Sequence, residues 1–116
     1  MLRRGVAFLS LAVLIAPARA EDATPNDYPT SARADYVLGC MAANGQTREA
    51  LERCSCSIDV IASILPYARY VEAETVLSMR QTTGQVASMF RNNPHTAEIV
   101  AELRRAQAEA EVQCFP

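Results

Sequence analysis

The sequence of 116 residues contains no lysine and a single histidine, His95. Enzymes often take their general bases and amine nucleophiles from these two residue types. The Gly-x-Ser-x-Gly and His-Glu-x-x-His motifs are absent as well, and no glycine-rich loop is suited to a phosphate. The sequence therefore predicts a protein that is not an enzyme and that uses no cofactor.

The chain also lacks a basic patch. Its 11 basic residues are all arginine and are outnumbered by 13 acidic residues, which gives a formal net charge of −2. Nucleic-acid binding depends on neutralising phosphates with basic side chains, and anionic lipid headgroups repel an acidic surface. We therefore expect neither nucleic acid nor a membrane surface among the partners of the mature protein.

The first twenty residues have the three parts of a secretory signal. Arg3 and Arg4 precede an apolar run over residues 6–15, and a small-x-small cleavage motif ends at Ala20. The apolar run is shorter than the roughly 20 residues that span a bilayer. We predict a signal peptide at residues 1–20, with export to the periplasm or secretion. Its removal would leave 8 arginines against 13 acidic residues, a net charge of −5.

Residues 21–29 are acidic, contain proline and show no periodicity, so they are predicted to form a flexible acidic leader before a domain at 30–116. That domain shows helical periodicity and no sustained strand alternation. Helices are expected at about 31–43, 48–65, 67–81 and 95–113, with a short helical segment at 85–91. Thr30 and Thr47 are expected N-caps. The prediction is an all-α, small four-helix bundle-like domain stapled by two disulfides.

The four cysteines, Cys40, Cys54, Cys56 and Cys114, all follow the predicted signal. An even number in a short exported chain indicates disulfides rather than a metal or redox centre. A thiol redox protein usually has Cys-x-x-Cys at the start of a helix beside a strand, and neither feature occurs here.

Cys54 and Cys56 are two residues apart on a predicted helix, so their side chains point about 200° apart and need different partners. The short turn after the first helix predicts an antiparallel hairpin that brings Cys40 near Cys54. The preferred pairing is therefore Cys40–Cys54 and Cys56–Cys114. The swapped pairing, Cys40–Cys56 with Cys54–Cys114, remains open.

Two groups of residues could bind a partner or a ligand. Tyr67 and Tyr70 follow Pro66 and are either interface anchors or lids over the core. His95 and three methionines, Met41, Met79 and Met89, could together bind copper(I). Methionines at such scattered positions are equally suited to filling a helical core.

Two acidic features carry no catalytic role. Glu72 and Glu74 lie on opposite sides of their predicted helix and cannot act as an acid–base pair. Asp59 is expected to be solvated.

The blocks CSCSIDVIASILPYARYVEAETV (54–76) and AQAEAEVQCF (106–115) resemble small exported bacterial Cys-x-Cys helical proteins associated with quinoprotein alcohol dehydrogenase systems. The resemblance covers most of residues 36–115 and implies a partner among larger exported enzymes. Together with the missing catalytic motifs, it predicts a non-enzymatic periplasmic accessory or binding protein with a protein partner. The alternative is a soft-metal (copper) or small-ligand carrier, followed by a thiol redox protein.

Overall fold

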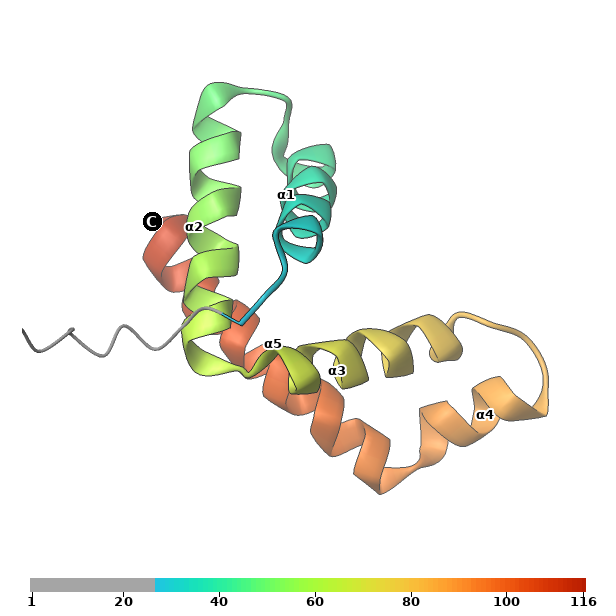
Figure 1. The fold of residues 1–116 in the computed structure, drawn as a ribbon. Coiled ribbons are helices and arrows are strands. Elements are labelled where there is room, and N and C mark those ends of the chain that lie inside the picture. Colours follow the sequence, from blue (N-terminus) through green and yellow to red (C-terminus); the bar gives the residue numbers. More distant parts are fainter. Residues whose placement is uncertain (1–26) are drawn as a thin grey trace, which may run out of the picture.

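The computed structural model describes residues 27–116, which form five α-helices and no strand. They are α1 (Thr30–Asn44), α2 (Arg48–Ile64), α3 (Tyr67–Arg80), α4 (Gln85–Asn92) and α5 (Pro94–Cys114) (Figure 1). The predicted all-α class is confirmed, and the short segment expected between the last two long helices is α4. The predicted signal peptide and residues 21–26 of the predicted leader lie outside the described residues.

Side-chain caps account for the starts of α2 and α5. The Thr47 side chain accepts a hydrogen bond of 3.0 Å from the Ala50 amide and caps α2, as expected. Asn93 caps α5 in the same way, with Pro94 in its first turn. The expected cap at Thr30 is wrong, because Pro29 holds the cap position and provides no side-chain hydrogen bond. Thr30 is instead the first residue of α1.

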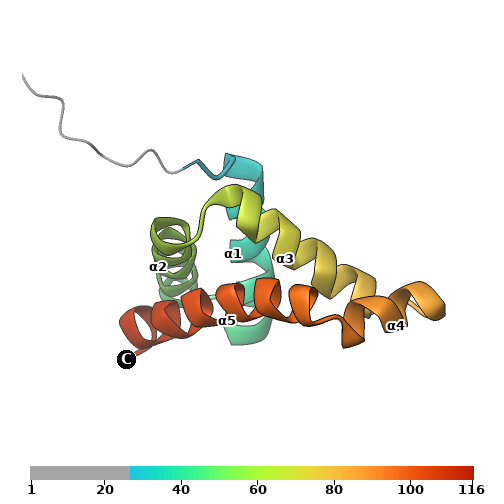
Figure 2. The same ribbon diagram turned by 90° about the horizontal axis from the view of Figure 1, so that it is seen from below.

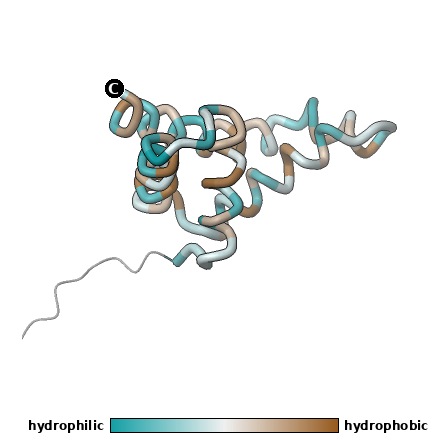
Figure 3. Tube along the Cα trace, turned by 90° about the horizontal axis from the view of Figure 1, so that it is seen from above, coloured by the Kyte–Doolittle hydropathy of each residue, from teal (hydrophilic) through white to brown (hydrophobic). Residues whose placement is uncertain are grey.

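Helix α5 organises the fold. It packs against α2 and α3, while α1 lies against α2 and α4 covers the ends of α3 and α5 (Figure 2). Hydrophobic and hydrophilic residues alternate along the helices instead of forming one long apolar run (Figure 3). Within residues 27–116, no helix is both long and apolar enough to cross a bilayer.

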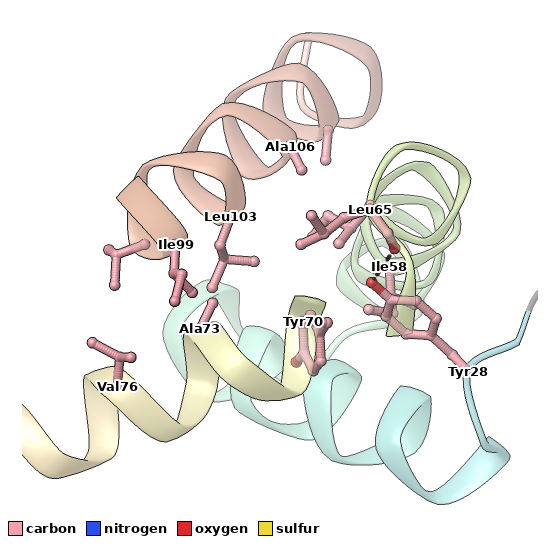
Figure 4. Packing of buried hydrophobic residues seen from close by; sticks show 12 residues of the cluster. Tyr28, Ile58, Leu65, Tyr70, Ala73, Val76, Ile99, Leu103 and Ala106 are labelled. Atoms are coloured by element: carbon pink, nitrogen blue, oxygen red, sulfur yellow. Dashed lines mark hydrogen bonds between the residues drawn. The ribbon is translucent and has the colours of Figure 1, made fainter. Parts of the chain in front are cut away.

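The core lies where α2, α3 and α5 meet (Figure 4). Small residues bring these helices together, since Ala73, Ala106 and Ala110 are almost completely buried. Larger aliphatic side chains fill the remaining space: Ile58, Ile61, Leu65, Val76, Ile99, Val100 and Leu103.

The last part of the predicted leader belongs to the folded domain, which corrects the flexible assignment for residues 27–29. The side chain of Tyr28 is only 4% exposed, and its hydroxyl donates a 2.7 Å hydrogen bond to the Leu65 carbonyl (Figure 4). The Asp27 carboxylate accepts from the Tyr67 amide in the first turn of α3. These two residues therefore satisfy backbone groups at the end of α2 and the start of α3.

Candidate interaction surfaces

Two disulfides fix the helices that carry the candidate surfaces. Cys40–Cys54 joins α1 to α2, and Cys56–Cys114 joins α2 to the end of α5, each with a Cα–Cα distance of 5.8 Å. The structure therefore has the preferred pairing and not the swapped one. None of the cysteines in the part of the chain described is free.

An apolar groove of about 480 Å³ runs between α1 and α2. We call it the hairpin groove and define it by Val37, Leu38, Met41, Leu51 and Ile58, which supply its apolar lining. Leu38 is 66% exposed, and no residue of α1 is fully buried. This pair of helices thus leaves an apolar surface without a partner within residues 27–116.

One rim of the hairpin groove carries an ion pair. Arg33 of α1 donates to the carboxylate of Asp59 on α2. Asp59 is exposed to solvent, as expected, and the ion pair is a contact that the sequence did not predict. The pair is exposed, so it contributes little to stability, but it leaves that rim electrically balanced.

Three tyrosines form a cluster where α3 begins. The Tyr28 ring lies 5.1 Å from the rings of both Tyr67 and Tyr70, between centroids. Tyr70 is only 9% exposed and belongs to the core, whereas Tyr67 is half-buried at its edge. The core-lid alternative therefore describes Tyr70. As an interface anchor it would have almost no free surface.

A second opening, of about 580 Å³, lies between α1 and α3. We call it the α1–α3 cleft and define it by six lining residues: Asp35, Tyr67, Tyr70, Val71, Glu74 and Met79. Burial raises the pKa of Glu74, the Arg104 guanidinium lowers it, and the Asp35 carboxylate raises it further. Burial also raises the pKa of Tyr70, and the Glu74 carboxylate adds to that shift.

Glu72 faces away from this cleft and pairs with Arg69, as its separation from Glu74 predicted. Arg69 also makes two hydrogen bonds, of 3.0 and 2.8 Å, to Glu102 of α5. The hydrogen bond from Arg69 holds the pKa of Glu102 below its usual value. This bidentate pair ties α3 to α5 outside the core.

The residues considered for copper do not form a common site. Met41 lines the hairpin groove and Met79 lines the α1–α3 cleft. Met89 on α4 is exposed, as is His95 in the first turn of α5. Among residues 27–116, no group of three or more His, Cys, Asp or Glu residues is placed to hold a metal ion.

Comparisons with known proteins add no further identification. No family model, no curated protein and no solved structure matches this chain. The sequence resemblance to exported Cys-x-Cys proteins therefore remains an expectation.

Sequence reasoning placed Tyr67, Tyr70 and Glu74 on one helix but did not bring them together with Asp35. The proximity of Asp35 to these three side chains depends on how α1 is oriented relative to α3. The apolar periodicity of either helix does not predict that orientation. The only available signal was the acidic Asp35 beside the aromatic Tyr36 on a weakly amphipathic helix. That signal is too common to indicate a site.

Proposed function

We propose that this protein is a non-enzymatic accessory protein of the periplasm or the secreted fraction. In this proposal, the hairpin groove docks a helix of a larger exported protein. The observation that carries the proposal is the unpartnered apolar groove between α1 and α2, with Leu38 66% exposed at its edge. Exposed apolar grooves of this kind are characteristic of protein-interaction sites.

The shape of the groove favours a helix as its occupant. Two adjacent helices leave a furrow along their length, and a third helix can lay an apolar face into it. The walls supply branched and flexible side chains, Leu38 and Met41 from α1 and Leu51 from α2. Flexible methionine side chains adapt to a partner's surface.

Charge favours a different protein over a second copy of this one. Residues 27–116 contain 8 arginines and 11 acidic residues, a formal net charge of −3. Two copies would therefore repel each other weakly, whereas a partner helix with basic flanking residues would be attracted. We accordingly assign the groove to an amphipathic helix with basic flanks.

The proposed compartment rests on two observations. Residues 1–20 have the pattern of a secretory signal, and the structure contains two disulfides. Disulfides form and persist mainly in oxidising compartments. The absence of catalytic motifs supports an accessory role beside the enzyme that the sequence resemblance suggests.

The test uses tagged mature protein to capture partners from a periplasmic extract of the native host, and it compares what the wild type and three variants capture. Leu38→Glu and Leu51→Glu place a charge in the groove, and Val112→Glu is the matched control because Val112 is 74% exposed on α5 away from the groove. The protein that occupies the groove should be captured by wild type and by Val112→Glu, but not by the two groove variants. A photoreactive side chain at position 38 should cross-link to a helix of that protein.

Two outcomes would overturn this assignment. Equal capture by wild type and by both groove variants would show that the groove is not the docking site. A dimer in light scattering that both Leu38→Glu and Leu51→Glu dissociate, and that Val112→Glu leaves intact, would assign the groove to a second copy. Helical content and the absence of free thiols show that each variant has folded.

A further inference from the structure

The α1–α3 cleft differs chemically from the hairpin groove and shares no lining residue with it. The described residues that line it include two carboxylates, Asp35 and Glu74, but no arginine or histidine. The walls also contain the rings of Tyr67 and Tyr70. An acidic cleft with aromatic and apolar walls is suited to a cation that carries apolar groups.

The Tyr70 hydroxyl is placed to meet a ligand. The residue is only 9% exposed, and its hydroxyl makes no hydrogen bond with any residue of 27–116. No buried side-chain oxygen or nitrogen in this part of the chain lacks a partner, so the hydroxyl is not sealed in the core. Besides burial, the charges of Glu74 and Asp35, which line the same cleft, raise the pKa of the Tyr70 hydroxyl, so the hydroxyl lies on the side of the cleft.

The two carboxylates are also available. Neither Asp35 nor Glu74 forms a hydrogen bond or ion pair within residues 27–116, in contrast to Glu72 and Glu102, which both pair with Arg69. Burial and the Asp35 charge raise the pKa of Glu74, while Arg104 of α5 opposes them. A cation bound between the carboxylates would relieve this repulsion.

We propose that the α1–α3 cleft binds an organic cation consisting of an ammonium group on an alkyl chain. The carboxylates of Asp35 and Glu74 and the hydroxyl oxygen of Tyr70 accept hydrogen bonds from the ammonium group.

The rest of the ligand contacts the walls of the cleft. The face of Tyr67 attracts the positive charge, and Val71 and Met79 contact the alkyl chain. The volume of about 580 Å³ is within the range of small-molecule sites. A divalent metal ion fits less well, because it needs about six oxygen ligands.

Titration calorimetry on the oxidised mature protein tests this site with 1,5-diaminopentane. The matched control ligand is 1,5-pentanediol, which has the same chain and no charge. The diamine should bind, and the diol should not bind at concentrations where the diamine saturates. Raising the salt concentration should weaken diamine binding because the cleft is open to solvent.

Variants assign the binding to the cleft. Glu74→Gln and Asp35→Asn each remove a negative charge that faces the ammonium group and should each weaken diamine binding about tenfold. Tyr70→Phe removes one hydrogen-bond acceptor and should weaken it about fivefold. Glu109→Gln removes the same charge from an exposed position of α5 outside the cleft and should leave the affinity unchanged. Tyr70→Phe keeps the ring, so the core packing remains.

The ammonium group could come from a free amine or from a lysine side chain of another protein, and a comparison of capped lysine with 1-aminopentane distinguishes these sources, because each carries one ammonium group. Stronger binding of 1-aminopentane indicates a free amine, and equal binding indicates a lysine side chain. Both results support the ammonium site. Equal binding of diamine and diol would overturn it, as would equal effects of Glu74→Gln and Glu109→Gln. Neither result depends on the hairpin groove.

Discussion

Substitution of Tyr28 tests whether residues 27–29 are part of the fold. The sequence assigns this tyrosine to a flexible leader, whereas the structure buries it between α2 and α3. Its ring packs beside Tyr67 and Tyr70, and its hydroxyl satisfies the Leu65 carbonyl at the end of α2. Tyr28→Ala removes both contributions, and Tyr28→Phe removes only the hydrogen bond.

The expected magnitudes follow from these contacts. Truncation of a buried aromatic side chain to alanine typically costs about 3–5 kcal/mol, which is a large part of the roughly 5–15 kcal/mol that stabilises a domain. Tyr28→Phe keeps the ring but leaves the Leu65 carbonyl without its donor, at a cost of about 1–2 kcal/mol. The two variants should therefore differ from each other by at least about 1 kcal/mol.

Urea unfolding of the oxidised mature protein, followed by far-ultraviolet circular dichroism, gives these free energies. Val112→Ala is the control, because Val112 is 74% exposed and should change stability by no more than about 0.5 kcal/mol. The reasoning is refuted if Tyr28→Ala is as stable as this control. In that case residues 27–29 would be leader, as the sequence alone predicted.

Two further predictions concern links between helices. Cys114→Ser should leave Cys56 as the only residue labelled by a thiol reagent in peptide mapping, and labelling of Cys54 instead would contradict the observed pairing. Glu102→Gln should make stability less sensitive to acid. Arg69 lowers the pKa of Glu102 in the folded state. The stabilisation by this ion pair is therefore fully present above the ordinary pKa of 4.5 and is lost as the pH falls through the folded-state pKa. Melting temperatures of wild type and Glu102→Gln, measured from about pH 7 to about pH 3, should therefore converge in acid, and parallel curves would show that the pair does not contribute.

The helices could be predicted because their signals are local. Thr47 caps α2, Pro66 follows its end, and Asn93-Pro94 begins α5, each through contacts within a few residues. The disulfide pairing was also favoured by local geometry, since two cysteines separated by one residue on a helix cannot bond to each other, and the short turn after α1 brings Cys40 near Cys54. Such features need no knowledge of how distant helices cross.

The features that the sequence did not predict depend on contacts between distant parts of the chain. Tyr28 is flanked by Asp27 and Pro29, so its segment resembles a linker. Its burial depends on contacts with the end of α2 and the start of α3, which begin 37 residues later at Leu65. Asp59 meets Arg33 only because α1 and α2 fold back on each other. The α1–α3 cleft was missed for the same reason, because Asp35 and Glu74 belong to helices that are not adjacent in the sequence.

Helix α1 contributes to both proposed surfaces. It supplies Val37 and Leu38 to the hairpin groove and Asp35 to the α1–α3 cleft. A helix that presents so much of its surface has few residues left to bury, and no residue of α1 is fully buried. Such an element would normally be weakly held.

The Cys40–Cys54 disulfide compensates for this missing burial. It closes a loop with a sequence separation of 14 residues, which on the chain-entropy estimate stabilises the folded state by about 3 kcal/mol. Cys56–Cys114, by contrast, joins α2 and α5, which already share the core. The first disulfide thus holds α1 in place while leaving its side chains free for ligands. Both proposed binding surfaces accordingly depend on the oxidised form of Cys40–Cys54.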